Sequence, residues 1–131
     1  MAKVIKDLWI LSEGGLLLYK QIFDERIDVQ MYGSLMSALS SFANEIIDGG
    51  LKSIELDLIR YIALKVNDFL FVSTSSKKVK EKKVQEELRK ISEKFFKLYS
   101  VDWIKHEWKH DSKAFEDFGK EIKDSFMKER K

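Results

Sequence analysis

Two apolar runs near the start of the chain are separated by a short polar turn. Residues 8–11 (LWIL) and 16–18 (LLL) flank residues 12–15 (SEGG). Adjacent glycines supply the positive φ angles of a tight turn, so we predict a β-hairpin with strands at residues 4–11 and 16–23. Because the apolar residues run together instead of alternating with polar ones, we expect both faces of the sheet to be covered.

The next segment has the apolar period of a helix. Asp28 is a favourable N-cap, and residues 48–50 (DGG) provide the glycine with which many helices end. The apolar side chains fill one arc of a helical wheel: Met31, Tyr32, Leu35, Met36, Leu39, Phe42, Ala43, Ile46 and Ile47. We predict a helix over residues 28–47 that lies on the sheet through this arc.

A strand pattern returns at Leu51 and predicts three more strands. The first contains Ile54 and Leu56, and the others cover residues 61–66 and 69–72. Residues 57–60 are the predicted link between the first two, and Asn67 and Asp68 are the predicted turn before the last. The whole sheet is therefore expected to have five strands.

Two amphipathic helices are predicted in the rest of the chain. Residues 73–76 (STSS) are expected to cap a long helix whose apolar positions recur at spacings of three and four: Val84, Leu88, Ile91, Phe95 and Leu98. Phe96 and Tyr99 widen this stripe, as is typical of packing on a sheet. A shorter last helix is marked by Phe115, Phe118, Ile122 and Phe126.

Composition is typical of one soluble globular domain over residues 1–131. Hydrophobic residues make up 44% and charged residues 35% of the chain, which excludes a disordered chain and a membrane-spanning one. Lys6 and Asp7 interrupt the early apolar run, so we expect no signal peptide. The chain contains no cysteine, which fits a reducing compartment and indicates the cytoplasm.

The predicted order β-β-α-β-β-β-α-α makes the chain resemble a longin domain, of the stand-alone kind found in archaea. The resemblance covers nearly the whole chain and is carried by residues 9–23 (WILSEGGLLLYKQIF), 60–76 (RYIALKVNDFLFVSTSS), the helix that follows, and residues 114–126 (AFEDFGKEIKDSF). It implies an α+β fold, an α/β sandwich with a five-stranded antiparallel sheet. The first strand would lie centrally, with one helix on one face and two on the other.

The resemblance also implies a non-enzymatic function. Longin domains bind small GTPases, pair with longin or roadblock-type domains, and recognise partners in membrane trafficking. A homodimer is one form of such pairing. The resemblance implies no catalytic residues, no cofactor and no metal. The chain lacks the G-x-x-x-x-G-K-[ST] loop, so it is not expected to be a P-loop GTPase itself.

One catalytic pattern provides an alternative from the enzyme class. Residues 106–110 (HEWKH) match H-E-x-x-H, in which His106 and His110 would bind zinc one helical turn apart and Glu107 would act as general base. Lys109 places a like charge beside the metal position, and Asp111 follows directly. The competing interpretation is an exposed turn whose tryptophans cover the edge of the sheet.

A lysine cluster provides a second alternative. Residues 77–131 hold 17 basic and 12 acidic residues, and the cluster opens this region with Lys77, Lys78, Lys80, Lys82 and Lys83. Such a cluster could hold the protein at an anionic membrane surface on the inner face of the membrane, or it could be a solvated face that keeps the protein soluble. Nucleic acid is not expected, because no aromatic residues or recognition motif accompany the lysines.

The first helix also has an unusual composition. Its residues 29–44 carry no charge, and the face opposite its apolar arc is predicted to consist of Gly33, Ser34, Ser37, Ser40, Ser41 and Asn44. A helix exposed to water usually carries Lys and Glu at such positions. Small uncharged residues allow another protein surface to approach closely, so these six residues are the candidate partner-binding face. The competing interpretation is a serine-rich helix face that is simply solvated.

Overall fold

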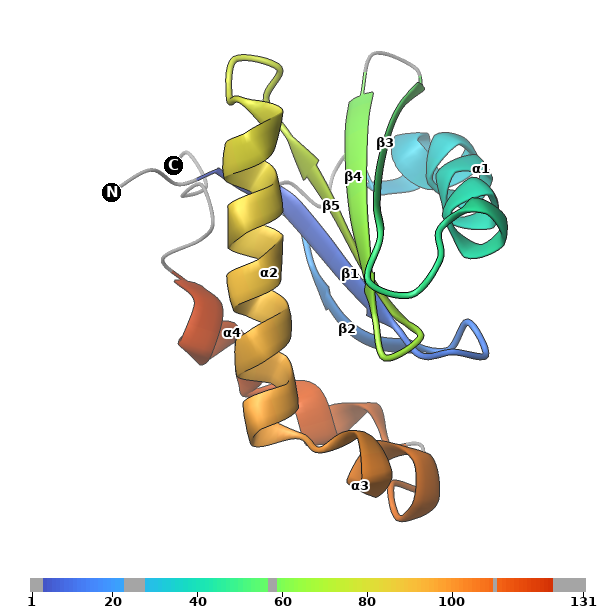
Figure 1. Ribbon diagram of the computed structural model, residues 1–131, viewed down its shortest axis with the longest axis vertical. Coiled ribbons are helices and arrows are strands. Elements are labelled where there is room, and N and C mark those ends of the chain that lie inside the picture. The colour runs from blue at the N-terminus through green and yellow to red at the C-terminus, as the bar shows by residue number, and fades with distance from the viewer. Residues whose placement is uncertain (1–3, 23–27, 57–58, 110, 124–131) are drawn as a thin grey trace.

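A five-stranded antiparallel sheet forms the centre of the protein (Figure 1). The computed structural model describes residues 4–22, 28–56, 59–109 and 111–123. The strands are β1 (Asp7–Leu11), β2 (Leu17–Gln21), β3 (Leu51–Leu56), β4 (Ile59–Val66) and β5 (Phe69–Ser75), in the order β2-β1-β5-β4-β3. The predicted α+β class and five-stranded antiparallel sheet are confirmed. The middle strand is β5, whereas β1 lies between β2 and β5, so the prediction of a central first strand is wrong.

Helical segments are more numerous than the sequence predicts. The described residues form α1 (Asp28–Glu45), α2 (Glu81–Leu98), α3 (Val101–His106), the 3₁₀-helix η2 (Ser112–Phe115) and α4 (Phe118–Ile122). The segment between the two predicted C-terminal helices folds into α3 because the Ser100 side chain accepts a hydrogen bond from the backbone N–H of Trp103. Phe115 lies in η2 instead of the last helix, and Phe126 lies outside the described residues. The predicted count of three helices is therefore wrong.

Two hydrophobic cores lie on opposite faces of the sheet. On one face, α1 packs through Leu35, Ala38, Phe42 and Ile46 against side chains that include Trp9, Tyr61 and Val72. On the other face lie α2, α3, η2 and α4, whose buried apolar side chains are Val84, Leu88, Ile91, Phe95, Ile104, Phe115, Phe118 and Ile122. Figure 1 shows α1 separated from the other helices by the sheet. Both faces are therefore covered, as the apolar runs of the first hairpin predict.

Two of the hairpin turns are where the sequence predicts them. The predicted link at residues 57–60 is too long, because Ile59 and Arg60 belong to β4. The N–H of Gly15 donates to the carbonyl of Ser12 at 2.9 Å, and Gly15 has a φ of 87°. Gly14 does not share this conformation, so the expectation that both glycines adopt positive φ is wrong. Asn67 and Asp68 form the β4–β5 turn with φ angles of 53° and 68°, the left-handed values of a two-residue hairpin turn.

The predicted cap of the long helix belongs to the sheet instead. Ser73, Thr74 and Ser75 are buried residues of β5, and the Thr74 hydroxyl donates to a carboxylate oxygen of the buried Asp7 at 2.5 Å. These side chains are needed within the sheet, so α2 begins later, with Lys80 as an N-cap whose side chain makes no capping hydrogen bond. At the other end of α2, Leu98 is 51% exposed and does not extend the apolar stripe as predicted.

Candidate functional site

The predicted partner-binding residues divide between the surface and the interior. Gly33, Ser37, Ser40 and Asn44 are exposed on α1. Ser34 is only 5% exposed, so its place on the outer face is wrong. Ser41 is half-buried at the flank of the helix.

A buried hydrogen bond explains why Ser34 faces the sheet. Its hydroxyl oxygen lies 2.7 Å from the phenol oxygen of Tyr61 on β4, whose side chain is completely buried. A buried phenol hydroxyl needs a polar partner. Ala38, one turn further along α1, is also completely buried. Helix α1 thus buries the side that carries Ser34 and Ala38. Its buried face is rotated relative to the apolar arc that the sequence predicts.

The same rotation exposes residues that the sequence assigns to the core. Met36 is 40% exposed, and Ala43 is also exposed. Together with the outward small residues they form a continuous uncharged face, which we call the α1 stripe: Gly33, Met36, Ser37, Ser40, Ala43 and Asn44. Their spacings of three and four residues are those of one helix face, a pattern that the sequence contains. Ile47, just beyond the helix, is 80% exposed, so its predicted place in the core is wrong too.

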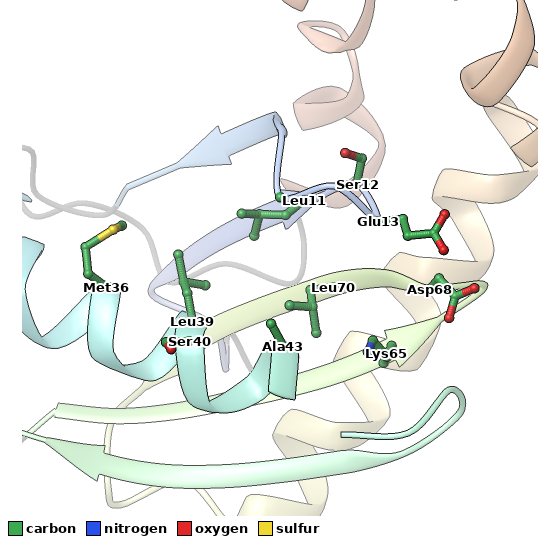
Figure 2. A pocket seen from close by; sticks show the side chains of 11 residues that line it. Leu11, Ser12, Glu13, Met36, Leu39, Ser40, Ala43, Lys65, Asp68 and Leu70 are labelled. Carbon is green, nitrogen blue, oxygen red and sulfur yellow. The ribbon is translucent and has the colours of Figure 1, made fainter. Parts of the chain in front are cut away.

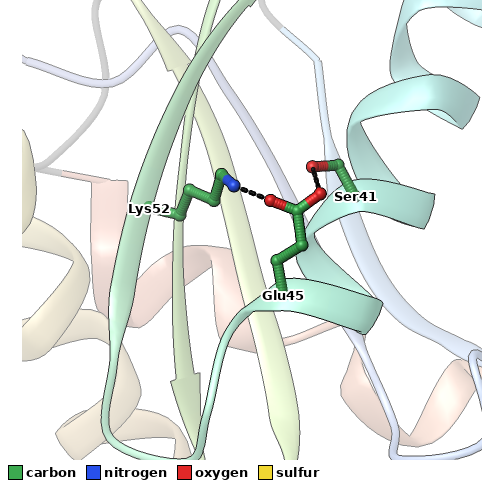
Figure 3. Close-up of polar contacts among 3 residues, drawn as sticks. All are labelled: Ser41, Glu45 and Lys52. Atoms are coloured by element: carbon green, nitrogen blue, oxygen red, sulfur yellow. Dashed lines mark hydrogen bonds and ion pairs between the residues drawn. The ribbon is translucent and has the colours of Figure 1, made fainter.

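Ser41 marks one boundary of the α1 stripe. Its hydroxyl donates to a carboxylate oxygen of Glu45 at 2.9 Å, and the other oxygen of this carboxylate pairs with Lys52 on β3 (Figure 3). Lys52 and Glu45 are both substantially exposed, so this ion pair contributes little to stability. The stripe therefore meets a charged rim on its β3 side.

On the other side, the α1 stripe borders a hollow that we call the α1 groove. Its volume is about 410 Å³, and it lies between α1, the β1–β2 hairpin and the β4–β5 turn. In Figure 2, Met36 and Leu39 of α1 extend toward Leu11 of the hairpin. The lining residues are Leu11, Ser12, Glu13, Gly15, Met36, Leu39, Ser40, Ala43, Lys65, Asp68 and Leu70. Apolar side chains form much of this lining, and Met36, Ser40 and Ala43 belong to both the groove and the stripe.

The charged residues of the α1 groove have other contacts. The ammonium of Lys65 donates to the carbonyl of Ile46 at 3.1 Å, and the carboxylate of Glu13 lies 3.8 Å from the Lys105 ammonium. The backbone N–H of Asp68 donates to a carboxylate oxygen of Asp48 at 2.7 Å. These contacts hold the polar rim in place around an apolar interior. Such a site can receive an apolar side chain of a partner and orient it by polar contacts at the rim.

The zinc motif is not continued on one helix in the described residues. Helix α3 ends at His106, and its C-cap Glu107 has φ and ψ of −121° and −24°. The N–H of Trp108 donates to the carbonyl of Trp103, five residues earlier, as the chain leaves the helix. His110 lies outside the described residues. Within the described part of the chain, no group of three or more His, Asp or Glu side chains could hold a metal ion.

The lysine cluster lies mostly before α2 rather than within it. Lys77 and Lys78 lie in the turn after β5, Lys80 is the N-cap, and only Lys82 and Lys83 are helical. A cap at residues 73–76 would have placed the whole cluster in the helix, and that expectation is wrong. The structure does not bring this cluster to the α1 stripe, because the stripe and α2 lie on opposite faces of the sheet (Figure 1).

Comparison with known proteins finds no family model and no curated protein that matches this chain. Among the described residues, no helix is long and apolar enough to cross a membrane.

Proposed function

We propose that this chain is a non-enzymatic binding module with a longin-like fold. In this proposal it docks a small GTPase, or another longin or roadblock-type domain, through the α1 stripe and the α1 groove. Membrane trafficking or GTPase regulation would be the setting. A second copy of the chain is one possible partner of the same class.

The observation that carries the proposal is the composition of the exposed α1 stripe. Protein interfaces are depleted of charge at their centre, and they enclose a few apolar anchors within a polar rim. Met36 supplies an exposed apolar side chain, and Ser37, Ser40 and Asn44 can be desolvated at less cost than lysine or glutamate. The adjoining groove adds a concave apolar surface that an anchor from the partner can fill.

The longin-like part of the proposal is supported by the element order. The chain runs through two strands, a helix, three strands and then helices, and the sheet is antiparallel throughout. Helix α1 covers one face of this sheet. A likeness in topology is compatible with several functions, so the proposal of partner binding rests on the surface of α1.

The sharpest test replaces Ser40, which belongs to both the stripe and the groove. Ser40→Glu places a charge at the proposed centre, whereas the control Lys97→Gln changes the net charge equally on the exposed last turn of α2. Parent, Ser40→Glu and Lys97→Gln chains would each be used to capture partners from cells of the native host. Sedimentation would measure self-association of the same three proteins.

The expected result is specific to Ser40. A small GTPase or a longin or roadblock-type protein should be retained by the parent and by Lys97→Gln. Its retention, or the self-association, should weaken about tenfold or more with Ser40→Glu, which corresponds to about 1.4 kcal/mol. If all three proteins retain and self-associate equally, the α1 stripe is not the docking surface. The edge strand β2 would be tested next, because its first residue Leu17 and the preceding Leu16 are 42% and 44% exposed.

A further inference from the structure

A second surface lies at the end of the sheet where β5 leads into α2. We call it the lysine platform: Lys77, Lys78, Lys80, Lys82 and Lys83, all of them exposed. Three of these lysines precede α2 and two lie in its first turn. In Figure 1 this segment is the loop and first turn at the top of α2.

Most of the positive charge of the platform is not balanced by ion pairs. Lys77 pairs with Glu55 on β3. In the described part of the chain, Lys78, Lys80, Lys82 and Lys83 form no ion pair, and Glu81 is the acidic residue of the first turn of α2. Cations at a helix N-terminus oppose the helix dipole, so the platform does not serve the stability of α2.

The backbone beneath the platform is held by Arg60 of β4. Its guanidinium donates to the Ser75 hydroxyl at 2.8 Å, to the Ser76 carbonyl at 2.9 Å and to the Val79 carbonyl at 2.6 Å. The Val79 side chain packs against the core of the α2 face. Hydrogen bonds from Arg60 and the packing of Val79 thus hold the backbone of this loop in place. The lysine side chains of the loop remain exposed.

We propose that the lysine platform binds the surface of an anionic lipid bilayer. Lysine is a compact charge on a flexible stem, and clustered lysines are attracted to acidic head groups through charge alone. Arg60, which could provide bidentate contacts to a fixed phosphate, is engaged within the protein instead. Residues 77–83 also contain no aromatic side chain on which a nucleic-acid base could stack. A laterally mobile lipid surface fits this arrangement better than nucleic acid does.

The position of the platform would orient the protein on the bilayer. Leu70 of β5 lines the α1 groove, whereas Ser75 at the other end of the same strand contacts Arg60 beneath the platform. Five residues of extended strand span roughly 17 Å. The groove and the platform therefore lie toward opposite ends of the sheet, and a protein bound through its lysines would hold the groove away from the lipid.

The test compares two variants with the same change in net charge. The platform variant combines Lys78→Gln, Lys80→Gln and Lys82→Gln. The control combines Lys97→Gln, Lys109→Gln and Lys113→Gln, which are exposed positions in the last turn of α2 and after α3. Circular dichroism would confirm that both are folded. Cosedimentation would then measure their binding to vesicles of phosphatidylserine and phosphatidylcholine, and to vesicles of phosphatidylcholine alone.

We expect the parent and the control to bind the mixed vesicles and the platform variant to bind about tenfold more weakly or worse. Binding of the parent should fall steeply as salt is added, because exposed charges are screened. The proposal is overturned if the two variants lose affinity equally, or if phosphatidylcholine alone binds the parent as well. Tighter binding to RNA or to an acidic polypeptide than to the mixed vesicles, at equal anionic charge, would also overturn it.

Discussion

The hydroxyl of Ser34 on α1 lies 2.7 Å from the phenol oxygen of Tyr61 on β4, and both side chains are buried. This contact joins the first helix to the sheet through polar atoms, on the face where Asp7 and Thr74 are also buried. Ser34 is buried at this contact, whereas Ser40 is exposed on another side of the helix. The candidate docking surface and this buried contact therefore lie on different sides of α1.

We expect Ser34→Ala to lower the free energy of unfolding by about 1 kcal/mol, because a buried hydroxyl loses a hydrogen-bond partner. Tyr61→Phe should have a similar effect. Since the two changes remove the same contact, the double variant should be less destabilised than the sum of the single variants. Urea unfolding of all four proteins measures this coupling, and strictly additive effects would contradict the hydrogen bond.

Ser34 and Ser37 provide a matched test of the rotation of α1. Ser37→Asp adds a charge at an exposed position and should change the free energy of unfolding by no more than about 0.5 kcal/mol. Ser34→Asp adds the same charge to the interior and should cost about 2 kcal/mol or more. Thermal and urea unfolding would compare the two. Equal stability would show that α1 is rotated differently.

Gly119 in α4 lies under the phenol of Tyr19 on β2. A Cβ atom at this position would be 2.5 Å from the Tyr19 hydroxyl oxygen. The phenol cannot easily move, because it donates to the Gln21 side chain at 2.6 Å and its ring packs edge-on against Phe118. We therefore expect Gly119→Ala to destabilise the protein by about 1 to 3 kcal/mol, as measured by urea unfolding.

Two controls isolate this clash from helix propensity. In a Tyr19→Phe background the nearest ring atom is 3.7 Å from the new methyl group, so Gly119→Ala should become neutral or stabilising. Gly33→Ala on α1 meets no atom within 4 Å and should raise the free energy of unfolding by up to about 1 kcal/mol. If Gly119→Ala is tolerated equally well with Tyr19 present, the close approach of α4 and β2 is wrong.

Tyr19 should also make stability depend on alkaline pH. Burial, with a smaller contribution from Tyr99, raises the pKa of Tyr19 to about 12, from the ordinary value of about 10. The folded state therefore disfavours the phenolate. The stabilising effect of this shift is complete below about pH 10 and is lost as the pH rises toward about 12. Over this pH interval the melting temperature of the parent should fall relative to that of Tyr19→Phe. Melting temperatures that change in parallel with pH would contradict the assignment.

Local sequence determined the number of strands and two of the turns between them. The apolar runs around residues 12–15 predicted the first hairpin, and Asn67 with Asp68 predicted the second, because turn conformation depends on the residues within the turn. The charge-free composition of α1 was also visible in the sequence. The sequence predicted the exposed face of α1 only in part. Ser37, Ser40 and Asn44 are exposed as predicted, whereas Ser34 is buried.

Tertiary structure decided how these elements face one another. Apolarity alone placed Met36 in the core and Ser34 on the surface, but α1 is rotated so that the Ser34 hydroxyl lies beside the buried Tyr61 hydroxyl. Likewise, residues 73–75 have the composition of a helix cap yet form part of β5, where Asp7 and Arg60 contact Thr74 and Ser75. The periodicity of apolar residues indicates which side of a helix is apolar. It contains no information on which buried polar atoms form hydrogen bonds, so a partner distant in sequence cannot be inferred from it.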